Sequence, residues 1–145
     1  MKFVIDSNIV FSAILHTESR IGQLIHLGSN KFEYYSIFQL KEEILNHKSK
    51  ILSLTEYSED QFSSIYDSIV SRIRFIDIDL ISDQVLHEAL ILVSDIDEND
   101  ALFVALGMHL DAKIWSGDRK LSIGLRKKGY DGVVSTEDLY KAFLK

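Results

Sequence analysis

The chain opens on Lys2-Phe-Val-Ile-Asp-Ser-Asn8, a short apolar run followed by polar residues whose side chains favour turns and helix starts. We therefore predict a buried strand over residues 2–6 that leads into a helix ending near Leu15. Asp6 then stands at the carboxyl end of a strand. In an open parallel sheet, ligands bind outside the carboxyl ends of the strands, so Asp6 is the first candidate for a functional residue.

The rest of the chain repeats this alternation of strand and helix. Further strands are predicted over residues 32–36, 75–80, 113–116 and 132–134, and the segments between them carry apolar residues at helical spacing. Alternation of this kind implies βαβ units with right-handed crossovers. We therefore expect an α/β fold of three layers, α/β/α, with a mainly parallel central sheet of roughly five strands.

Several helices and one edge strand have clear local signals. Ser58 and Gln61 have the spacing of a capping box, and apolar residues continue at helical intervals as far as Ile73. Residues 37–47 are predicted as one helix, and residues 101–110 are apolar nearly all round, which predicts a buried helix. In the strand over residues 75–80, Asp77 and Asp79 are predicted to face water at the sheet edge.

Composition sets limits on the class of protein. With 145 residues, of which 46% are hydrophobic and 26% charged, we expect a single globular domain spanning residues 1–145. The absence of Cys excludes disulfides and thiolate sites. The N-terminal apolar run is too short for a signal peptide or a membrane span, so we expect a cytoplasmic protein with no membrane association.

The formal net charge of −6 argues against a protein that coats nucleic acid through a broad basic surface. It does not exclude a nuclease, because divalent cations bound in one acidic pocket would invert the local field that a phosphate meets.

Each acidic residue taken alone has an ordinary structural explanation, as a helix cap, a turn residue or a solvated charge. Their placement suggests more. Asp6 and Asp118 stand at strand ends, Asp100 opens the helix that leads into the Asp118 strand, and Glu43 lies about two turns into the helix after the second strand. Four acids can therefore converge at one rim of the sheet.

A group of carboxylates at close range is unfavourable, because like charges raise each other's pKa and oppose folding. A divalent cation removes that conflict. With no Cys and no His-x-x-His pattern in the sequence, hard oxygen ligands suit Mg²⁺ or Mn²⁺. The chemistry favoured by such a site is phosphoryl transfer with water activated by metal.

Four motifs, in order along the chain, are similar to those of a known family. They are Val4-Ile-Asp-Ser-Asn8, Leu40-Lys-Glu-Glu-Ile44, Asp97-Glu-Asn-Asp-Ala-Leu-Phe-Val-Ala105 and Ile114-Trp-Ser-Gly-Asp118. Together they make the whole chain resemble a PIN domain, the fold of many VapC-like toxins of bacterial and archaeal toxin–antitoxin systems.

The resemblance implies a catalytic set that holds one or two Mg²⁺ or Mn²⁺ ions: Asp6, Glu43, Asp100 and Asp118. Glu43 is preferred to Glu42 because an aliphatic residue, Ile44, follows it directly, as in the family. Asp97 is either a further metal ligand or a charge that complements the start of a helix.

The resemblance also implies roles for several neighbours. Asn8 and Ser116 correspond to the small polar residues that support the acids, while Arg119 and Lys120 follow Asp118 and are expected to contact the RNA backbone. The basic group at residues 126–128 is either an outer RNA-binding patch or a charged helix face.

By this resemblance the protein is expected to be a metal-dependent endoribonuclease that leaves 5′-phosphate and 3′-hydroxyl ends. It would be the toxin of a type II toxin–antitoxin pair, acting as a homodimer and silenced by a small antitoxin that inserts residues into the acidic groove.

Two alternatives from other classes stay open at this point. One is a receiver-like Mg²⁺-binding signalling domain, although Asp6 lacks an adjacent acid and Val134 is followed by Ser135 where that class has Lys. The other is a non-catalytic PIN scaffold that acts as a binding module. A serine hydrolase is disfavoured because Ser7 has no evident His partner.

Overall fold

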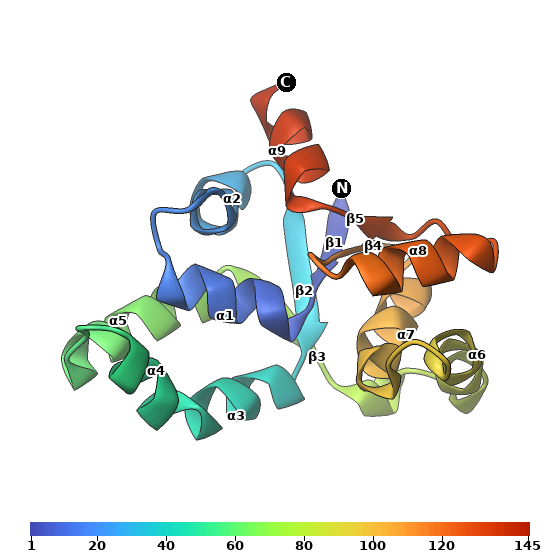
Figure 1. The fold of residues 1–145 in the computed structure, drawn as a ribbon, viewed down its shortest axis with the longest axis horizontal. Helices are drawn as coiled ribbons and strands as arrows, with labels where there is room; N and C mark the ends of the chain where they lie inside the picture. The colour runs from blue at the N-terminus through green and yellow to red at the C-terminus, as the bar shows by residue number, and fades with distance from the viewer.

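The computed structural model describes residues 1–145 and builds them around one five-stranded sheet (Figure 1). The order is β3-β2-β1-β4-β5, and every neighbouring pair is parallel. The predicted α/β class and strand number are confirmed, and the sheet is entirely parallel. The strands are β1 (Lys2–Ile5), β2 (Glu33–Ile37), β3 (Ile73–Ile76), β4 (Lys113–Trp115) and β5 (Val133–Val134).

The strand order reverses between β1 and β4. The chain leaves β1 for β2 and β3 on one side, then returns to the other side through β4 and β5. Ile5 of β1 pairs with Trp115 of β4, so the two strands finish at the same level. In open α/β sheets this switch point is where ligand sites form, because the loops that leave the two strands diverge there.

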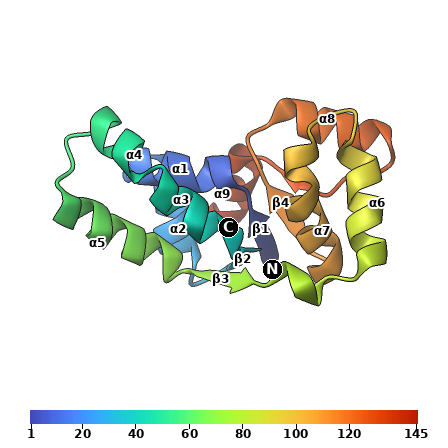
Figure 2. The same ribbon diagram turned by 90° about the horizontal axis from the view of Figure 1, so that it is seen from below.

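Helices cover both faces of the sheet, which gives the expected three layers. In Figure 2, α6, α7 and α8 lie on one side, and α1, α2 and α9 lie on the other. The helices are α1 (Ser7–Leu15), α2 (Arg20–Gly28), α3 (Gln39–Asn46), α4 (Lys48–Leu54), α5 (Glu59–Val70), α6 (Asp83–Val93), α7 (Ala101–Leu110), α8 (Arg119–Lys127) and α9 (Thr136–Leu144). None of these helices has the length and apolar character needed to cross a bilayer.

The core lies between the sheet and these helices and joins 33 buried hydrophobic residues in one cluster. As predicted, α7 is buried on most of its surface: every residue from Phe103 to Gly107 is buried. Trp115 of β4 is fully buried, and its indole Nε1 donates to Thr136 Oγ1 at 3.0 Å. This hydrogen bond ties β4 to the start of α9.

The predicted capping box is present: the Ser58 side chain accepts from the Gln61 amide, and the Gln61 side chain accepts from the Ser58 amide. Other local predictions were wrong. Ile73 does not continue α5 but opens β3, where it pairs with Tyr34 of β2. Tertiary pairing outweighs the helical spacing here, because β3 completes the sheet edge.

The predicted strand over residues 75–80 is also shorter than expected. After Ile76 the chain forms a 3₁₀ turn at Ile78–Leu80, and the Asp77 side chain caps it by accepting from the Asp79 amide. Asp77 and Asp79 therefore lie beyond the edge strand and not on its wet side. The helix predicted over residues 37–47 is likewise α3 alone, followed by α4, which the sequence analysis did not predict.

Candidate metal centre

Asp6 lies directly after β1 at the switch point and is 4% exposed. Its Oδ1 accepts from the Ile9 amide at 3.0 Å and so caps α1. Burial raises the pKa of this carboxyl, and the charge of Asp118 raises it further, while hydrogen bonds from the Ser116 side chain and from backbone amides act in the opposite direction. The site thus contains a buried acid whose charged form is costly unless a cation compensates it.

Asp118 follows β4, the strand beside β1, and caps α8. Its Oδ1 accepts from the amides of Lys120 at 2.9 Å and Leu121 at 3.3 Å. Ser116, which is 3% exposed, accepts from the Asp118 amide through its Oγ at 3.1 Å. Ser116 therefore contacts both aspartates at the strand ends and holds them in fixed relation.

Asp100 stands at the start of α7, but its side chain makes no capping hydrogen bond. Its Oδ2 atom is buried and has no hydrogen-bond partner. Burial, and then the charges of Asp97, Asp118 and Asp6, raise the pKa of Asp100 to about 6. Asp97 is itself exposed and caps the 3₁₀ turn at Glu98–Asp100, where its Oδ1 accepts from the Asn99 amide.

This arrangement fits a divalent cation. A buried carboxylate oxygen without a partner is costly, and three aspartates within electrostatic reach of one another oppose their own ionisation. The chain holds no preassembled cage of three or more acidic or imidazole ligands. Mg²⁺ needs no such cage, because it commonly binds through one or two carboxylates and keeps several waters.

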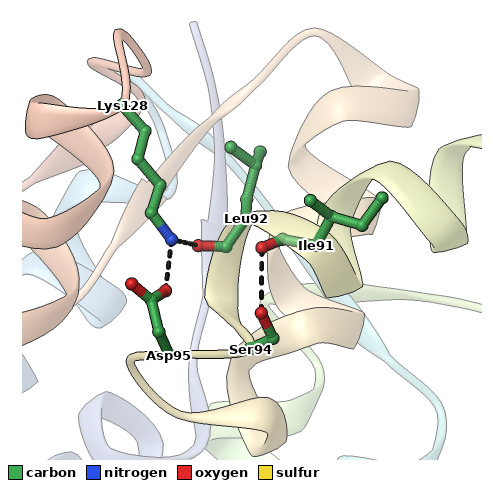
Figure 3. A network of polar contacts seen from close by, with 5 residues as sticks. All are labelled: Ile91, Leu92, Ser94, Asp95 and Lys128. Atoms are coloured by element: carbon green, nitrogen blue, oxygen red, sulfur yellow. Dashed lines mark hydrogen bonds and ion pairs between the residues drawn. The ribbon is translucent and has the colours of Figure 1, made fainter.

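The loop that carries Asp97 and Asp100 is anchored to α8. Figure 3 shows Lys128 after α8 donating from Nζ to the Leu92 carbonyl and to the Asp95 carboxylate. A positive charge on carbonyls at the C-terminus of α6 also complements the helix dipole. Lys128 is therefore engaged in this contact, unlike its neighbours Arg126 and Lys127 in the same basic group.

Glu43 is less closely linked to the three aspartates. It is half-buried on α3. Together with Asn8, His47 and Lys50 it lines a cavity of about 330 Å³, and we call this the Glu43 cavity. Its charge is not among the causes that raise the pKa of Asp6 or Asp100. Glu42 lines a different cavity, beside Lys41. Asp6, Asp97 and Asp118 thus lie within electrostatic range of Asp100, while Glu43 shares a cavity with Asn8.

Three cavities adjoin along this surface. The first, which we call the Arg126 cavity after one of its lining residues, has a volume of about 300 Å³. It shares Gly117 and Asp118 with a second cavity of about 380 Å³, which Asn8 also lines. Asn8 in turn lines the Glu43 cavity. Asp118 therefore lies where two of the cavities meet, within a run of cavities that reaches from α8 and α9 to α3 and α4.

Cationic residues line both outer cavities. Arg119 and Arg126 line the Arg126 cavity, and Lys50 lines the Glu43 cavity. Arg119 and Lys50 form no ion pair within the chain. Lys120, which was predicted to contact RNA with Arg119, is exposed and does not line the Arg126 cavity. Ser135 and Asp138, which no sequence motif marked as site residues, do line it.

Fold and site together define an α/β protein with an acidic, cation-compatible centre at the switch point of a parallel sheet. A family model described as PIN domain matches residues 4–137, and the chain belongs to the PIN domain family. PIN domains are generally nucleases that use divalent metal ions. The family and the fold expected from the sequence motifs are therefore confirmed.

Two solved structures share this fold at low sequence identity. VapBC2 from Rickettsia felis, bound to a DNA fragment from its promoter, has a TM-score of 0.66 at 17% identity over 93% of this chain and 97% of that one. PAE2754 from Pyrobaculum aerophilum has a TM-score of 0.67 at 14% identity over 99% of this chain and 96% of the other. No curated protein sequence matches.

Proposed function

We propose that this chain is a Mg²⁺- or Mn²⁺-dependent endoribonuclease that hydrolyses RNA phosphodiester bonds and is the toxin of a type II toxin–antitoxin pair. One observation carries the proposal: the buried, unpartnered Oδ2 of Asp100 lies in the electrostatic field of Asp6 and Asp118 at the sheet's switch point. A carboxylate in that position needs either a proton or a cation, and family membership favours the cation.

Asp6, Asp100 and Asp118 would hold the ion, with Glu43 and Asp97 as further candidates. When bound, the ion would lower the pKa of a coordinated water and place positive charge opposite the phosphate oxygens. The chain itself supplies the orientation. The backbone amides at the starts of α1 and α8 fix Asp6 and Asp118 through capping bonds, and Ser116 keeps the two caps in register. Such pre-organisation is the main contribution a protein makes to phosphoryl transfer.

The three adjoining cavities suit an extended single strand. Negative charge lies in the middle, where the scissile phosphate would meet the ion, and Arg119, Arg126 and Lys50 lie to either side. Cations there can contact flanking phosphates without a broad basic surface, which agrees with the net charge of −6.

The biological role belongs to the same proposal. The fold shared with VapBC2, a complex seen with promoter DNA, supports a small antitoxin partner that covers the acidic centre. A homodimer and a cytoplasmic location complete the proposed role. Family membership removes the receiver-like alternative and leaves the non-catalytic scaffold as an outcome of the test.

The test is cleavage of a single-stranded RNA by purified protein with Mn²⁺, with Mg²⁺ or with EDTA. Wild type should cleave only with metal and leave 5′-phosphate and 3′-hydroxyl ends. Asp6→Asn and Asp100→Asn should lose about 100-fold or more in rate, the loss expected when a group that stabilises the transition state is removed. Asn keeps the cap at position 6, so that variant is expected to fold.

A matched pair examines Glu43: Glu43→Gln should slow cleavage, and Glu42→Gln, which changes the exposed neighbouring charge, should not. Equal rates for wild type and both aspartate variants, or cleavage that needs no metal, would refute the assignment. Absence of any cleavage would leave the scaffold as the better description.

A further inference from the structure

The Arg126 cavity lies next to the metal centre but contains groups that the proposed hydrolysis does not use. Along α8, cavity-lining residues recur at positions 119, 122, 123 and 126, the spacing of one helix face. The start of α9 closes the opposite wall with Ser135 and Asp138. At about 300 Å³, the cavity lies at the lower end of the size range of small-molecule pockets.

The cavity is lined by charges of both signs: Arg119, Arg126 and the metal-site acid Asp118 on the α8 side, and Asp138 on the α9 side. Arg119 and Arg126 come from α8, and Arg126 is held only by an exposed Nε contact of 3.7 Å to Asp131, which leaves its other guanidinium donors free. Asp138 comes from α9, and its carboxylate has no ion pair or hydrogen bond within the chain. Ser135 Oγ accepts from the Asp138 amide, so its hydroxyl proton is free to donate.

These groups match the parts of one ribonucleotide. Arginine donors suit a phosphate, and the exposed side chain of Ile123 offers an apolar surface to a sugar or base. A free carboxylate suits a hydroxyl donor, but it repels phosphate. A 2′-hydroxyl can donate to a carboxylate, and DNA lacks that hydroxyl.

We propose that the Arg126 cavity binds the nucleotide next to the cleaved bond, with Arg119 and Arg126 on its phosphate and Asp138 accepting a hydrogen bond from its ribose 2′-hydroxyl. Asp138 is then the residue that selects RNA over DNA. This inference rests on the proposed nuclease function for its substrate, but it concerns binding and not the chemical step.

The experiment measures binding separately from cleavage. In an Asp100→Asn background with EDTA, which suppresses turnover, fluorescence anisotropy gives the Kd of a labelled single-stranded RNA and of DNA of the same sequence. Asp138→Ala should weaken RNA binding by about tenfold, the value of one charged hydrogen bond, and should leave DNA binding equal or slightly tighter. Arg126→Ala should weaken RNA and DNA alike, by about tenfold.

Matched controls remove the same charge without touching the cavity. Glu137→Ala takes an acid from the same first turn of α9, and Lys127→Ala takes a cation from the same helix as Arg126; neither residue lines the cavity. Glu137→Ala should keep the RNA-over-DNA preference, and Lys127→Ala should lose less affinity than Arg126→Ala.

The inference is overturned if Asp138→Ala tightens RNA and DNA equally, since Asp138 would then act only by repulsion. It is also overturned if the Asp100→Asn parent protein binds both polymers equally or binds neither. A failure of the nuclease proposal would give a different result. The protein with Asp100 intact would not cleave RNA, but the preference for RNA over DNA would still be lost in Asp138→Ala. The subsite would then belong to a non-catalytic protein.

Discussion

Gly124 of α8 lies directly against Ile96 of the loop that carries Asp97 and Asp100. A methyl group at position 124 would lie 2.5 Å from Ile96 Cδ1 and 2.9 Å from Ile96 Cγ1. Because Asp118 caps the start of the same helix, this close approach fixes the distance from Asp118 to the loop acids Asp97 and Asp100. The Lys128 contacts with Leu92 and Asp95 reinforce it.

Gly124→Ala is therefore expected to weaken the metal site. Alanine in a helix interior usually gains roughly 0.5–1 kcal/mol over glycine, but overpacking costs about 1–3 kcal/mol. We expect no net gain in the free energy of unfolding, measured by urea denaturation, and a several-fold loss of Mn²⁺ affinity. A more stable variant with unchanged Mn²⁺ affinity would show that the loop is not held by this contact.

The double variant Ile96→Val, Gly124→Ala provides the control. Valine lacks the Cδ1 atom that makes the 2.5 Å contact. Ile96→Val alone should destabilise the protein by about 0.5–1.5 kcal/mol, and it should cost less in the Gly124→Ala background. Strict additivity in this double-mutant cycle would contradict a direct contact.

The pKa of Asp100 predicts that the free energy of unfolding of the metal-free protein depends on pH. The folded pKa, about 6, lies above the ordinary value of 3.8. The group therefore contributes stability that is fully present below pH 3.8 and is lost as pH rises through about 6. Asp100→Asn removes the charge, so its Tm in EDTA should exceed that of wild type by more at pH 8 than near the ordinary value of 3.8.

Screening by solvent limits that gain to about 2–4 °C. Added Mn²⁺ should reverse the order at pH 8, because an ion that binds the native state raises the Tm of wild type more than that of the weaker-binding variant. A Tm difference that is the same at both pH values would show that Asp100 does not titrate in this range.

Thr136→Val tests how the sheet is joined to α9. The variant leaves the buried indole Nε1 of Trp115 without its 3.0 Å partner, and an unsatisfied buried donor costs about 1–3 kcal/mol. Thr136→Ser keeps the hydroxyl and should lose less. Urea denaturation of the two variants gives the comparison, and equal losses would mean that the methyl group, not the hydrogen bond, stabilises this position.

The fold could be predicted from sequence where local signals and tertiary packing agree. The strand before Asp6, the capping box at Ser58 and the buried helix after Asp100 are all present. The signals failed where pairing in the sheet decided the outcome, as at Ile73, which has the spacing of α5 but lies in β3. The break between α3 and α4 has no side-chain cap to mark it.

The candidate site was predictable only in part, for a related reason. Asp6 and Asp118 follow from strand ends, and those positions can be read along the chain. The unpartnered oxygen of Asp100 and the approach of Ile96 to Gly124 depend on how distant segments pack, which no local pattern encodes. Asp138 was missed because it looks like an ordinary acid in the first turn of a helix.

Mn²⁺ binding to Asp100→Asn, measured by isothermal titration calorimetry at pH 7.5, tests whether the unpartnered carboxylate of Asp100 holds the ion. Glu98→Gln is the matched control, because it removes a charge from the same 3₁₀ turn at an exposed position. We predict that Asp100→Asn binds Mn²⁺ at least about tenfold more weakly than wild type, a loss of about 1.4 kcal/mol, and that Glu98→Gln stays near wild type. Equal Mn²⁺ affinity in Asp100→Asn and Glu98→Gln would contradict the account.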